Sequence, residues 1–368
     1  MGLGKRYYVR LQMTAKAEVA KETLSVAEVE ALCTYFPVAL PIREHRPLFG
    51  GYSGTSIAVV GADGTKAVLK ICNDYTVADA TSQAAVAAHA AAAGFMGVCA
   101  PMLRKDGSGC VFPRADGTPV MMLTWVEGKA VDKVLSSGDV DKATILASVG
   151  AGLAALHSVP VSASTKLRAC EKGSGACDVS KHISGELMRK MKGSVHTKAH
   201  PFVTECYMTE CASLTQSMGA EGLPRGVLHG DPFLDNMLCD PKTVSATTSA
   251  THPPFRMLML SPRVSQGELV GLVDLEDFCL GPLLFDVACC ASACCFRDDG
   301  ALDIRRLRAL LEGYAAVRPL TPVERKHFLA FMRLTMLCNC TWRFINFNID
   351  HREIEECRNA HVEVSRQD

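Results

Sequence analysis

An eight-residue segment with a histidine, two aspartates and an asparagine carries the groups that phosphoryl transfer requires. It reads His-Gly-Asp-Pro-Phe-Leu-Asp-Asn over residues 229–236 and follows an apolar pair, Val227 and Leu228. A loop of this form places one carboxylate where it accepts a proton from an alcohol, and five residues later an amide whose oxygen can bind magnesium. We therefore expect Asp231 to be the catalytic base and Asn236 to be a metal ligand.

A second group of acids follows the apolar residues 269–273. Asp274 and Glu276 come at the end of this run, which has the composition of a buried strand. Because side chains alternate along a strand, these two acids would point to the same side and both would face a magnesium-bound nucleotide. Asp274 and Glu276 are therefore expected to be metal ligands, with Asp274 the principal one.

One lysine, Lys70, lies in the apolar stretch Val-Leu-Lys-Ile at residues 68–71. A cation in such a strand needs an anionic partner, and the α- and β-phosphates of ATP would serve. The glycine-rich residues 50–56 lie between predicted strands and not before a helix, so they form neither a Walker loop nor a dinucleotide fingerprint. Their backbone N–H groups could cover the phosphates, and the residues expected to do so are Gly51, Ser53, Gly54 and Thr55.

Each of these features alone has a more ordinary explanation. A glycine-rich hairpin is more often a plain turn, a lysine in a strand usually lies at an edge with its charge in water, and an aspartate after a strand often just begins a loop. Their order along the chain favours a shared catalytic role over these separate structural explanations. A lysine strand, a capped helix, a linker, a His-Gly-Asp loop and an acid-tipped strand follow one another as they do in protein-kinase-like enzymes.

The elements that must position these groups are predicted first as a small sheet with one helix. Ser25 and Glu28 form a capping box that opens a short helix before the sheet. Thr76 and Asp79 form a second capping box, and Gly94 ends the helix that it opens. Asp-Gly turns at 63–64 and 116–117 separate neighbouring strands. Strands are expected at residues 48–53, 57–61, 66–71, 110–113 and 120–125.

The remainder of the chain predicts mostly helices. Residues 121–127 form the linker into this part, where Met122 and Thr124 are expected to contact the nucleotide. Residues 142–157 are amphipathic, and Thr321 with Glu324 caps a long helix near the C-terminus. Stretches rich in Ser, Thr, Gly and Pro are expected to be surface insertions whose role the sequence leaves open; they lie within residues 160–200 and 241–268.

The predicted fold class is α+β, with a protein-kinase-like two-lobed fold. The expected divisions are a flexible tail at residues 1–24, a nucleotide-binding N-lobe with an antiparallel sheet and one helix at 25–126, and a larger, mainly helical C-lobe with the catalytic loop, metal site and substrate pocket at 127–368. A chain of 368 residues suits two lobes, each with its own apolar interior.

Composition narrows the partners and the compartment. Lysine plus arginine equal aspartate plus glutamate at 39 each, so no overall field attracts nucleic acid or an anionic membrane. The 17 cysteines lie largely in apolar helical stretches without paired C-x-x-C units, which indicates reduced thiols and not metal ligands. No apolar run reaches the roughly 18 to 20 residues of a membrane helix. A soluble, cytoplasmic protein is expected, and whether the basic N-terminus targets an organelle stays open.

The chain resembles the aminoglycoside phosphotransferase and choline kinase superfamily, and within it the type II homoserine kinases. Residues 229–238 are similar to the family loop His-x-Asp-Leu-Phe-x-Asp-Asn, residues 281–288 resemble the segment after the metal aspartate, and residues 313–324 resemble the C-terminal helices. The resemblance covers roughly residues 35–350 and implies ATP and Mg²⁺ as cofactors. The segment Asp274-Leu275-Glu276 is also similar to the choline kinase pattern.

Three features of the sequence depart from the family pattern. Pro232 stands where leucine is usual, and the insertion between Asn236 and Asp274 is longer than the family hairpin. The helix after Thr76 contains no glutamate to hold Lys70. Gln83, on the first turns of that helix, is the best substitute that the sequence offers, and it would hold the lysine by a neutral hydrogen bond.

The resemblance implies a small-molecule amino alcohol as acceptor, most closely L-homoserine, which would give O-phospho-L-homoserine in threonine biosynthesis. Its ammonium and carboxylate need an acid and a cation near the base, and Asp235 and Arg343 are the residues expected to supply them. A choline-like acceptor would need a cage of aromatic side chains around its quaternary ammonium, and the chain has only 2 tryptophans and 7 tyrosines, which favours an amino acid such as homoserine. The sequence leaves two alternatives open. One is a choline, ethanolamine, hydroxylysine or aminoglycoside kinase, and the other is an inactive binding protein of the same fold. The oligomeric state is open as well.

Overall fold

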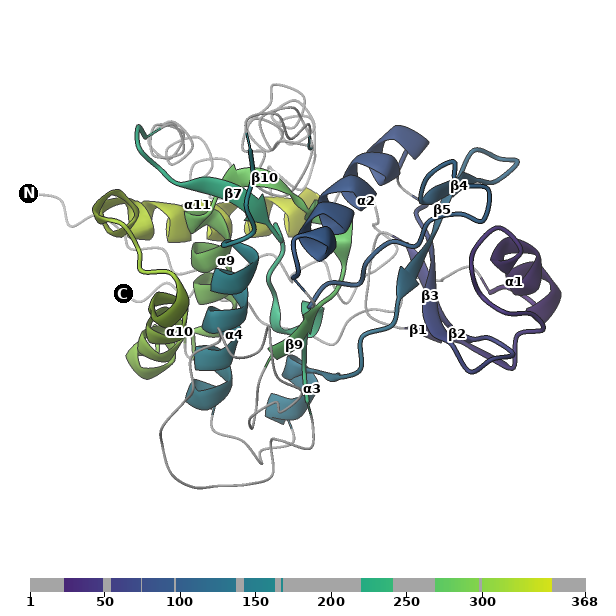
Figure 1. Cartoon of the computed structure of the whole chain (residues 1–368). Coiled ribbons are helices and arrows are strands. Elements are labelled where there is room, and N and C mark those ends of the chain that lie inside the picture. The colour runs from purple at the N-terminus through teal and green to yellow at the C-terminus, as the bar shows by residue number, and fades with distance from the viewer. Residues whose placement is uncertain are drawn as a thin grey trace, which may run out of the picture.

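A computed structural model gives the fold of most of the chain and places its elements in two lobes (Figure 1). The smaller lobe contains a five-stranded antiparallel sheet with strand order β1-β2-β3-β5-β4 and the helices α1 and α2. The residues that the structure describes are 23–48, 54–73, 75–95, 97–136, 142–162, 167, 220–240, 269–297 and 300–345. The elements of the smaller lobe are α1 (Val26–Cys33), β1 (Glu44–Leu48), β2 (Thr55–Val60), β3 (Lys66–Ile71), α2 (Val77–Ala92), β4 (Val111–Pro113) and β5 (Pro119–Thr124).

Both faces of the sheet are covered, because side chains on β3 alternate between two apolar clusters. Ala67, Leu69 and Ile71 are fully buried and join the cluster beneath α1. Lys70 points to the other face, towards α2, and pairs in register with Ser56 on β2 and Met121 on β5. The alternation predicted for residues 66–71 is confirmed, and it places the lysine on the side of the sheet where α2 packs.

The first strand lies earlier than predicted. The sequence suggested a strand at residues 48–53, but β1 ends at Leu48 and the next strand begins at Thr55. β1 is an edge strand with the exposed sequence Glu-His-Arg-Pro-Leu, so it lacks the apolar alternation by which strands are recognised. Pro47 is tolerated there because an edge strand needs fewer ladder donors.

Helix α2 begins and ends as its sequence predicts. Thr76 accepts a hydrogen bond from the Asp79 backbone, and the Asp79 carboxylate accepts one from the Thr76 backbone, so the capping box is complete. Gly94 has a φ of +88°, which ends the helix in the left-handed conformation. The helix contacts β4 and, in the larger lobe, the turn at residues 275–277.

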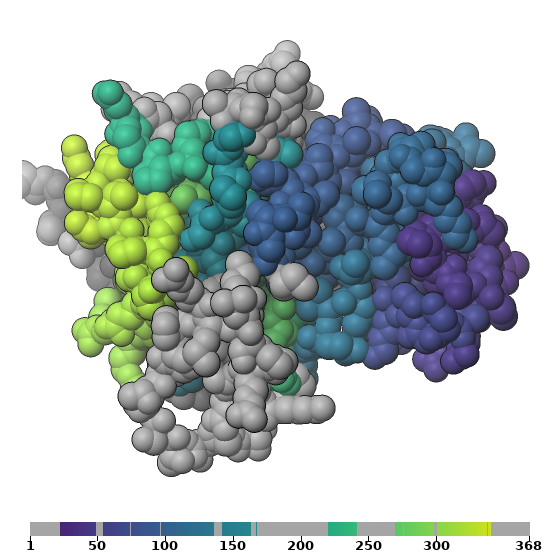
Figure 2. Space-filling model, viewed as in Figure 1, coloured from purple at the N-terminus to yellow at the C-terminus, as the bar shows by residue number. Residues whose placement is uncertain are grey.

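The larger lobe is mainly helical, with two small sheets that hold the loops of interest. β6, β8 and β9 form one sheet, and β7 pairs with β10 in the other. Figure 1 shows α4, α9, α10 and α11 gathered at the end of the molecule opposite α1, and Figure 2 shows the same separation on the surface. The elements are β6 (Lys129–Ala130), α3 (Val131–Ser136), α4 (Lys142–Leu156), β7 (Arg225–Leu228), the 3₁₀ turn η2 (Leu234–Asn236), β8 (Met237–Cys239), β9 (Leu269–Leu272), the 3₁₀ turn η4 (Leu275–Asp277), β10 (Cys279–Pro282), α9 (Leu284–Cys294), α10 (Ile304–Val317) and α11 (Pro322–Ile345).

Helices α4 and α10 cross at two glycines. A Cβ atom at Gly150 would lie 2.1 Å from the Leu310 carbonyl oxygen, and one at Gly313 would lie 1.9 Å from the Ala147 carbonyl oxygen. Only a residue without a side chain allows such an approach. The crossing brings Tyr314 on α10 next to His157, the residue that follows α4.

Two expectations from composition can be compared with the structure. Within the described part of the chain, no helix combines the length and apolarity needed to cross a bilayer. No disulfide bond joins cysteines of these residues, and all of them except Cys110 are buried. The predicted insertions lie almost entirely outside the described residues.

Candidate active site

The candidate catalytic loop, residues 229–236, lies between β7 and β8, and one carboxylate holds its backbone. Asp286, on the first turn of α9, accepts hydrogen bonds from the backbone N–H of His229 at 2.7 Å and of Gly230 at 3.0 Å. The ring Nε2 of His229 contacts the Val273 carbonyl oxygen at 2.9 Å. These contacts fix the backbone immediately before Asp231 relative to the segment that carries the other acids.

Asp231 and Asn236 contact each other directly. The Asn236 amide nitrogen donates to the carbonyl oxygen and to Oδ2 of Asp231, both at 3.0 Å. Burial, together with the negative charges of Asp277, Asp274 and Asp235, raises the pKa of Asp231 well above its usual value, and the hydrogen bond from Asn236 opposes this only in part. A carboxylate with a raised pKa is a better proton acceptor near neutral pH.

Lys70 lies between two acids of the larger lobe. Its Nζ is 2.8 Å from Oδ1 of Asp274 and 2.7 Å from Oε1 of Glu276, and its side chain is 7% exposed. Burial alone would lower the pKa of Lys70, but the two carboxylates raise it well above its usual value. Burial and the neighbouring Asp274 raise the pKa of Glu276 to about 7. The expected lysine and the expected metal acids therefore meet at one point.

The route by which the two acids meet differs from the one predicted. They were expected to alternate along a strand, but β9 ends at Leu272. Asp274 adopts a φ of +66°, and η4 then carries Glu276. A left-handed residue followed by a 3₁₀ turn reverses the chain, so the turn and not strand alternation brings the acids together.

Gln83 does not take the role that its position suggested. It is buried on α2, but its amide nitrogen has no hydrogen-bond partner, and the partners of Lys70 are Asp274 and Glu276. The Tyr75 hydroxyl, just before α2, donates to Oε2 of Glu276 at 3.4 Å. Among the described residues, Glu276 thus supplies the lysine with the second acid that α2 lacks.

The residues expected at the nucleotide are only partly brought together. Gly54 packs tightly, since a Cβ there would lie 2.7 Å from the Ile71 carbonyl oxygen and 3.6 Å from Oε1 of Glu276. Thr55 is fully buried with its hydroxyl unsatisfied. Gly51 and Ser53 lie outside the described residues.

The linker residues Met122 and Thr124, expected at the nucleotide, have partners within the small lobe. Met122 belongs to the cluster beneath α1, on the sheet face opposite Lys70, and its carbonyl oxygen accepts from Met102 N–H. The Thr124 backbone N–H donates to the Ala100 carbonyl oxygen, and the Thr124 hydroxyl accepts from the Ala100 N–H. The strand register places Met121, not Met122, opposite Lys70.

The two expected acceptor residues differ in what can be said of them. Asp235 lies in η2, between Asp231 and Asn236 in the sequence, and its charge contributes to the raised pKa of Asp231. Arg343 lies on the last turns of α11, but its side chain is outside the described residues.

Comparison with known proteins decides the family. Residues 44–246 and 258–320 match the phosphotransferase enzyme family. The chain belongs to this phosphotransferase family. Its resemblance to the aminoglycoside phosphotransferase and choline kinase superfamily, stated above from the catalytic loop, is thereby confirmed.

Relatives of this phosphotransferase are informative to different degrees. The homoserine kinase of Xanthobacter autotrophicus is 29% identical over 231 residues, which cover 62% of this chain and 58% of the relative, so the chain spans under two thirds of its length. The solved amicoumacin kinase hAmiN, in complex with AMP-PNP and Ca²⁺, has a TM-score of 0.62 at 12% identity, covering 90% of this chain and 92% of that one. A microcompartment-associated aminopropanol kinase has a TM-score of 0.62 at 15% identity, covering 92% and 93%. The structural likenesses confirm the kinase-like α+β fold.

The site of this phosphotransferase contains two further groups, Asp277 and Tyr75, that the sequence motifs do not include. Asp277 contributes most among the charges that raise the pKa of Asp231, and its backbone packs against Gly230, where a Cβ would lie 2.5 Å from the Asp277 carbonyl oxygen. The acidic run at residues 274–277 was the available signal. Tyr75 gave no signal, because its contact with Glu276 joins parts of the chain that are distant in sequence.

The side chains present fit a magnesium–nucleotide complex. Magnesium prefers hard oxygen ligands, and the carboxylates of Asp274 and Glu276 lie beside Lys70 at the base of the site. A lysine next to paired acids, an unsatisfied hydroxyl at Thr55 and a glycine at position 54 are suited to phosphate groups and their counter-ion.

Proposed function

We propose that this phosphotransferase is an ATP-dependent small-molecule kinase that phosphorylates an alcohol, with L-homoserine as its acceptor and O-phospho-L-homoserine as its product. The observation that carries the proposal is the convergence of Lys70, Asp274 and Glu276 next to the hydrogen-bonded pair of Asp231 and Asn236. The homoserine kinase relative supports the choice of acceptor. Such a product belongs to threonine biosynthesis.

In this account Asp231 accepts the proton of the acceptor hydroxyl. Asn236 orients that carboxylate through its amide nitrogen, which leaves the amide oxygen to bind the metal. Bound magnesium–ATP would supply the phosphoryl group, and its magnesium ion would offset the negative charge of the phosphates. Asn236, Asp274 and Glu276 would hold the metal.

The nucleotide would be held from the small lobe. Lys70 would hold the phosphates, with Gly51, Ser53, Gly54 and Thr55 covering them. The ion pairs of Lys70 with Asp274 and Glu276 support this role, because they hold the lysine beside the two acids proposed to bind the metal. Preorganised charge of this kind lowers the cost of binding.

The acceptor would be recognised by its two charges. Asp235, one residue before Asn236, is proposed to bind the ammonium group, and Arg343 the carboxylate. The N-lobe, residues 25–126, would bind the nucleotide, and the C-lobe, residues 127–368, would bind the metal and the acceptor. We also propose that the protein acts in the cytoplasm.

Two other functions are compatible with the same site. A choline, ethanolamine, hydroxylysine or aminoglycoside kinase would use the same base and metal residues with another acceptor. An inactive nucleotide-binding protein is suggested by the missing glutamate of α2. Glu276, from the larger lobe, pairs with Lys70 instead, which favours an active enzyme.

A substrate panel tests the acceptor. Purified protein with magnesium and ATP is assayed for ADP release with L-homoserine, hydroxylysine, choline, ethanolamine and an aminoglycoside. Selective turnover of homoserine is expected. Turnover of another acceptor would replace the substrate but keep the mechanism, and no turnover with magnesium-independent stabilisation by ATP would favour the binding protein.

A further inference from the structure

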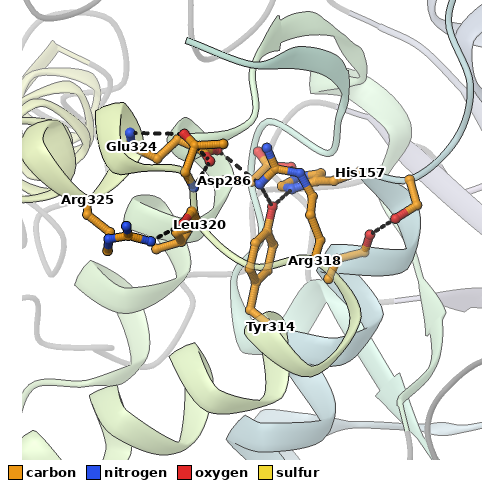
Figure 3. A network of polar contacts seen from close by, with 10 residues as sticks. His157, Asp286, Tyr314, Arg318, Leu320, Glu324 and Arg325 are labelled. Carbon is orange, nitrogen blue, oxygen red and sulfur yellow. Dashed lines mark hydrogen bonds and ion pairs between the residues drawn. The ribbon is translucent and has the colours of Figure 1, made fainter. Parts of the chain in front are cut away.

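A chain of polar side chains, buried except for the partly exposed Arg318, leads from the catalytic loop to the start of α11. Beneath the loop, Asp286 is 3.1 Å from Nε2 of His157, whose Nδ1 is 2.7 Å from the Tyr314 hydroxyl. The Arg318 guanidinium donates to that hydroxyl at 2.8 Å and lies 3.0 Å from the Glu324 carboxylate. Figure 3 shows Tyr314 between His157 and Arg318, with one contact to each.

The order of donors along this chain follows from the chemistry of its ends. Arginine has only donors, so the Tyr314 hydroxyl must accept from Arg318. The single hydroxyl hydrogen is then directed at Nδ1 of His157, which must accept it. The other ring nitrogen, Nε2, therefore carries the hydrogen and donates it to Asp286.

The reverse order would leave a buried hydrogen without a partner. If His157 donated from Nδ1, the Tyr314 hydroxyl would accept from both neighbours and its own hydrogen would be unsatisfied. The side chains of His157 and Asp286 and the whole of Tyr314 are 0% exposed, so water does not compensate. The donor order is thus set by Arg318, which Glu324 holds in place.

We propose that Tyr314 is a positioning residue for the catalytic loop: its hydroxyl passes the donor order of Arg318 to His157, and so fixes the Asp286 carboxylate that holds the backbone before Asp231. The link to catalysis rests on the proposed function. The segment at residues 313–324, which resembled the C-terminal helices of homoserine kinases, acquires in this way a role that its distance in sequence from the loop conceals.

Glu324 anchors the far end of the chain. Its Oε2 accepts from the backbone N–H and the hydroxyl of Thr321, at 2.8 Å and 2.9 Å, so the capping box of α11 fixes the carboxylate that pairs with Arg318. The glycine crossing of α4 and α10 fixes His157 relative to Tyr314 from the other side. The Glu324 end of the hydrogen-bond chain and its central contact between His157 and Tyr314 are therefore both held by neighbouring backbone.

The tautomer of His157 is the first readout, because it is independent of any substrate. Protein labelled with ¹⁵N-histidine is studied by long-range ¹H–¹⁵N correlation, with His157→Gln to assign the signal. We expect the wild type to carry the hydrogen on Nε2 and to lack one on Nδ1. Hydrogen on Nδ1 in the wild type would overturn the proposal.

Tyr314→Phe removes the hydroxyl and keeps the ring. We expect that the hydrogen on the His157 ring is no longer found on Nε2 alone, and that amide hydrogen exchange at His229 and Gly230 becomes faster. We also expect kcat to fall about tenfold with little change in the KM for ATP, as found for residues that orient a catalytic group. Tyr35→Phe is the matched control, since Tyr35 stacks on Phe112 in the small lobe.

The outcomes separate this proposal from the proposed function. Wild-type His157 signals and wild-type loop exchange in Tyr314→Phe would overturn the positioning role, whatever the acceptor proves to be. Changed signals and exchange in a protein that turns over none of the acceptors would support the positioning of the loop and count against the proposed function alone.

Discussion

The Nζ atom of Lys70 lies 2.7 Å from Oε1 of Glu276, so an acid of the larger lobe holds the lysine of the small sheet. Helix α2 has Asp79 in its first turn and no glutamate, and its Gln83 is not a partner of the lysine. The contact joins the two lobes at the point where the nucleotide phosphates are proposed to bind.

Replacing Glu276 by glutamine removes one of the two charges that hold Lys70. Because a hydrogen bond to a charged group contributes roughly 1.5–3 kcal/mol, the free energy of unfolding should fall by about that amount. Stabilisation by magnesium–ATP should weaken as well, since the lysine and the metal both lose a carboxylate. Denaturant unfolding with and without the nucleotide measures both effects.

Gln83→Met is the matched control for this variant. The Gln83 amide nitrogen is buried without a hydrogen-bond partner, so an apolar side chain of similar length should leave the free energy of unfolding unchanged or raise it. A larger loss in Gln83→Met than in Glu276→Gln would show that the lysine depends on α2 after all.

Gly230→Ala should disrupt the catalytic loop. Gly230 has a φ of +86°, and a Cβ there would lie 2.5 Å from the Asp277 carbonyl oxygen. A left-handed alanine costs on the order of 1–2 kcal/mol, and the close contact adds to it. Thermal unfolding should show a lower Tm, and the activity should be lost. Gly117→Ala is the control: its φ of +86° brings the same strain with no atom within 4 Å of the added carbon, so normal activity is expected.

Thr76→Ala tests the capping box of α2. The Thr76 hydroxyl accepts from the Asp79 N–H, and loss of such a cap costs about 1 kcal/mol. Thr81→Ala is the comparison on the same helix, because the Thr81 hydroxyl only donates back to the Val77 carbonyl oxygen. Equal stability of the two variants in urea unfolding would contradict the role of the cap.

Much of this arrangement could be predicted from the sequence because the signals were local. Capping boxes at Ser25 and Thr76 set the helix starts, and alternation in residues 66–71 set the face of Lys70. The family loop at residues 229–236 singled out Asp231 and Asn236 as site residues, and the structure brings these two side chains into contact.

The rest depended on geometry that local patterns do not encode. Asp274 has a positive φ, and Asp274 and Glu276 therefore lie in a turn and not on a strand. β1 is an exposed edge strand, so it lacks the apolar alternation that predicts a strand. The strand register turned Met122 away from the lysine face. Contacts between distant segments, such as Glu276 with Lys70 and Tyr314 with His157, had no counterpart in spacing or composition.

The most direct test of the central claim is the rate of magnesium-dependent ADP formation with L-homoserine in Asp231→Asn against the wild type. Asparagine keeps the shape of the side chain but does not accept the hydroxyl proton, so kcat should fall by about 100-fold or more while ATP binding and Tm persist. A variant that retains near-normal kcat would contradict the assignment of Asp231 as the base and with it the proposed mechanism.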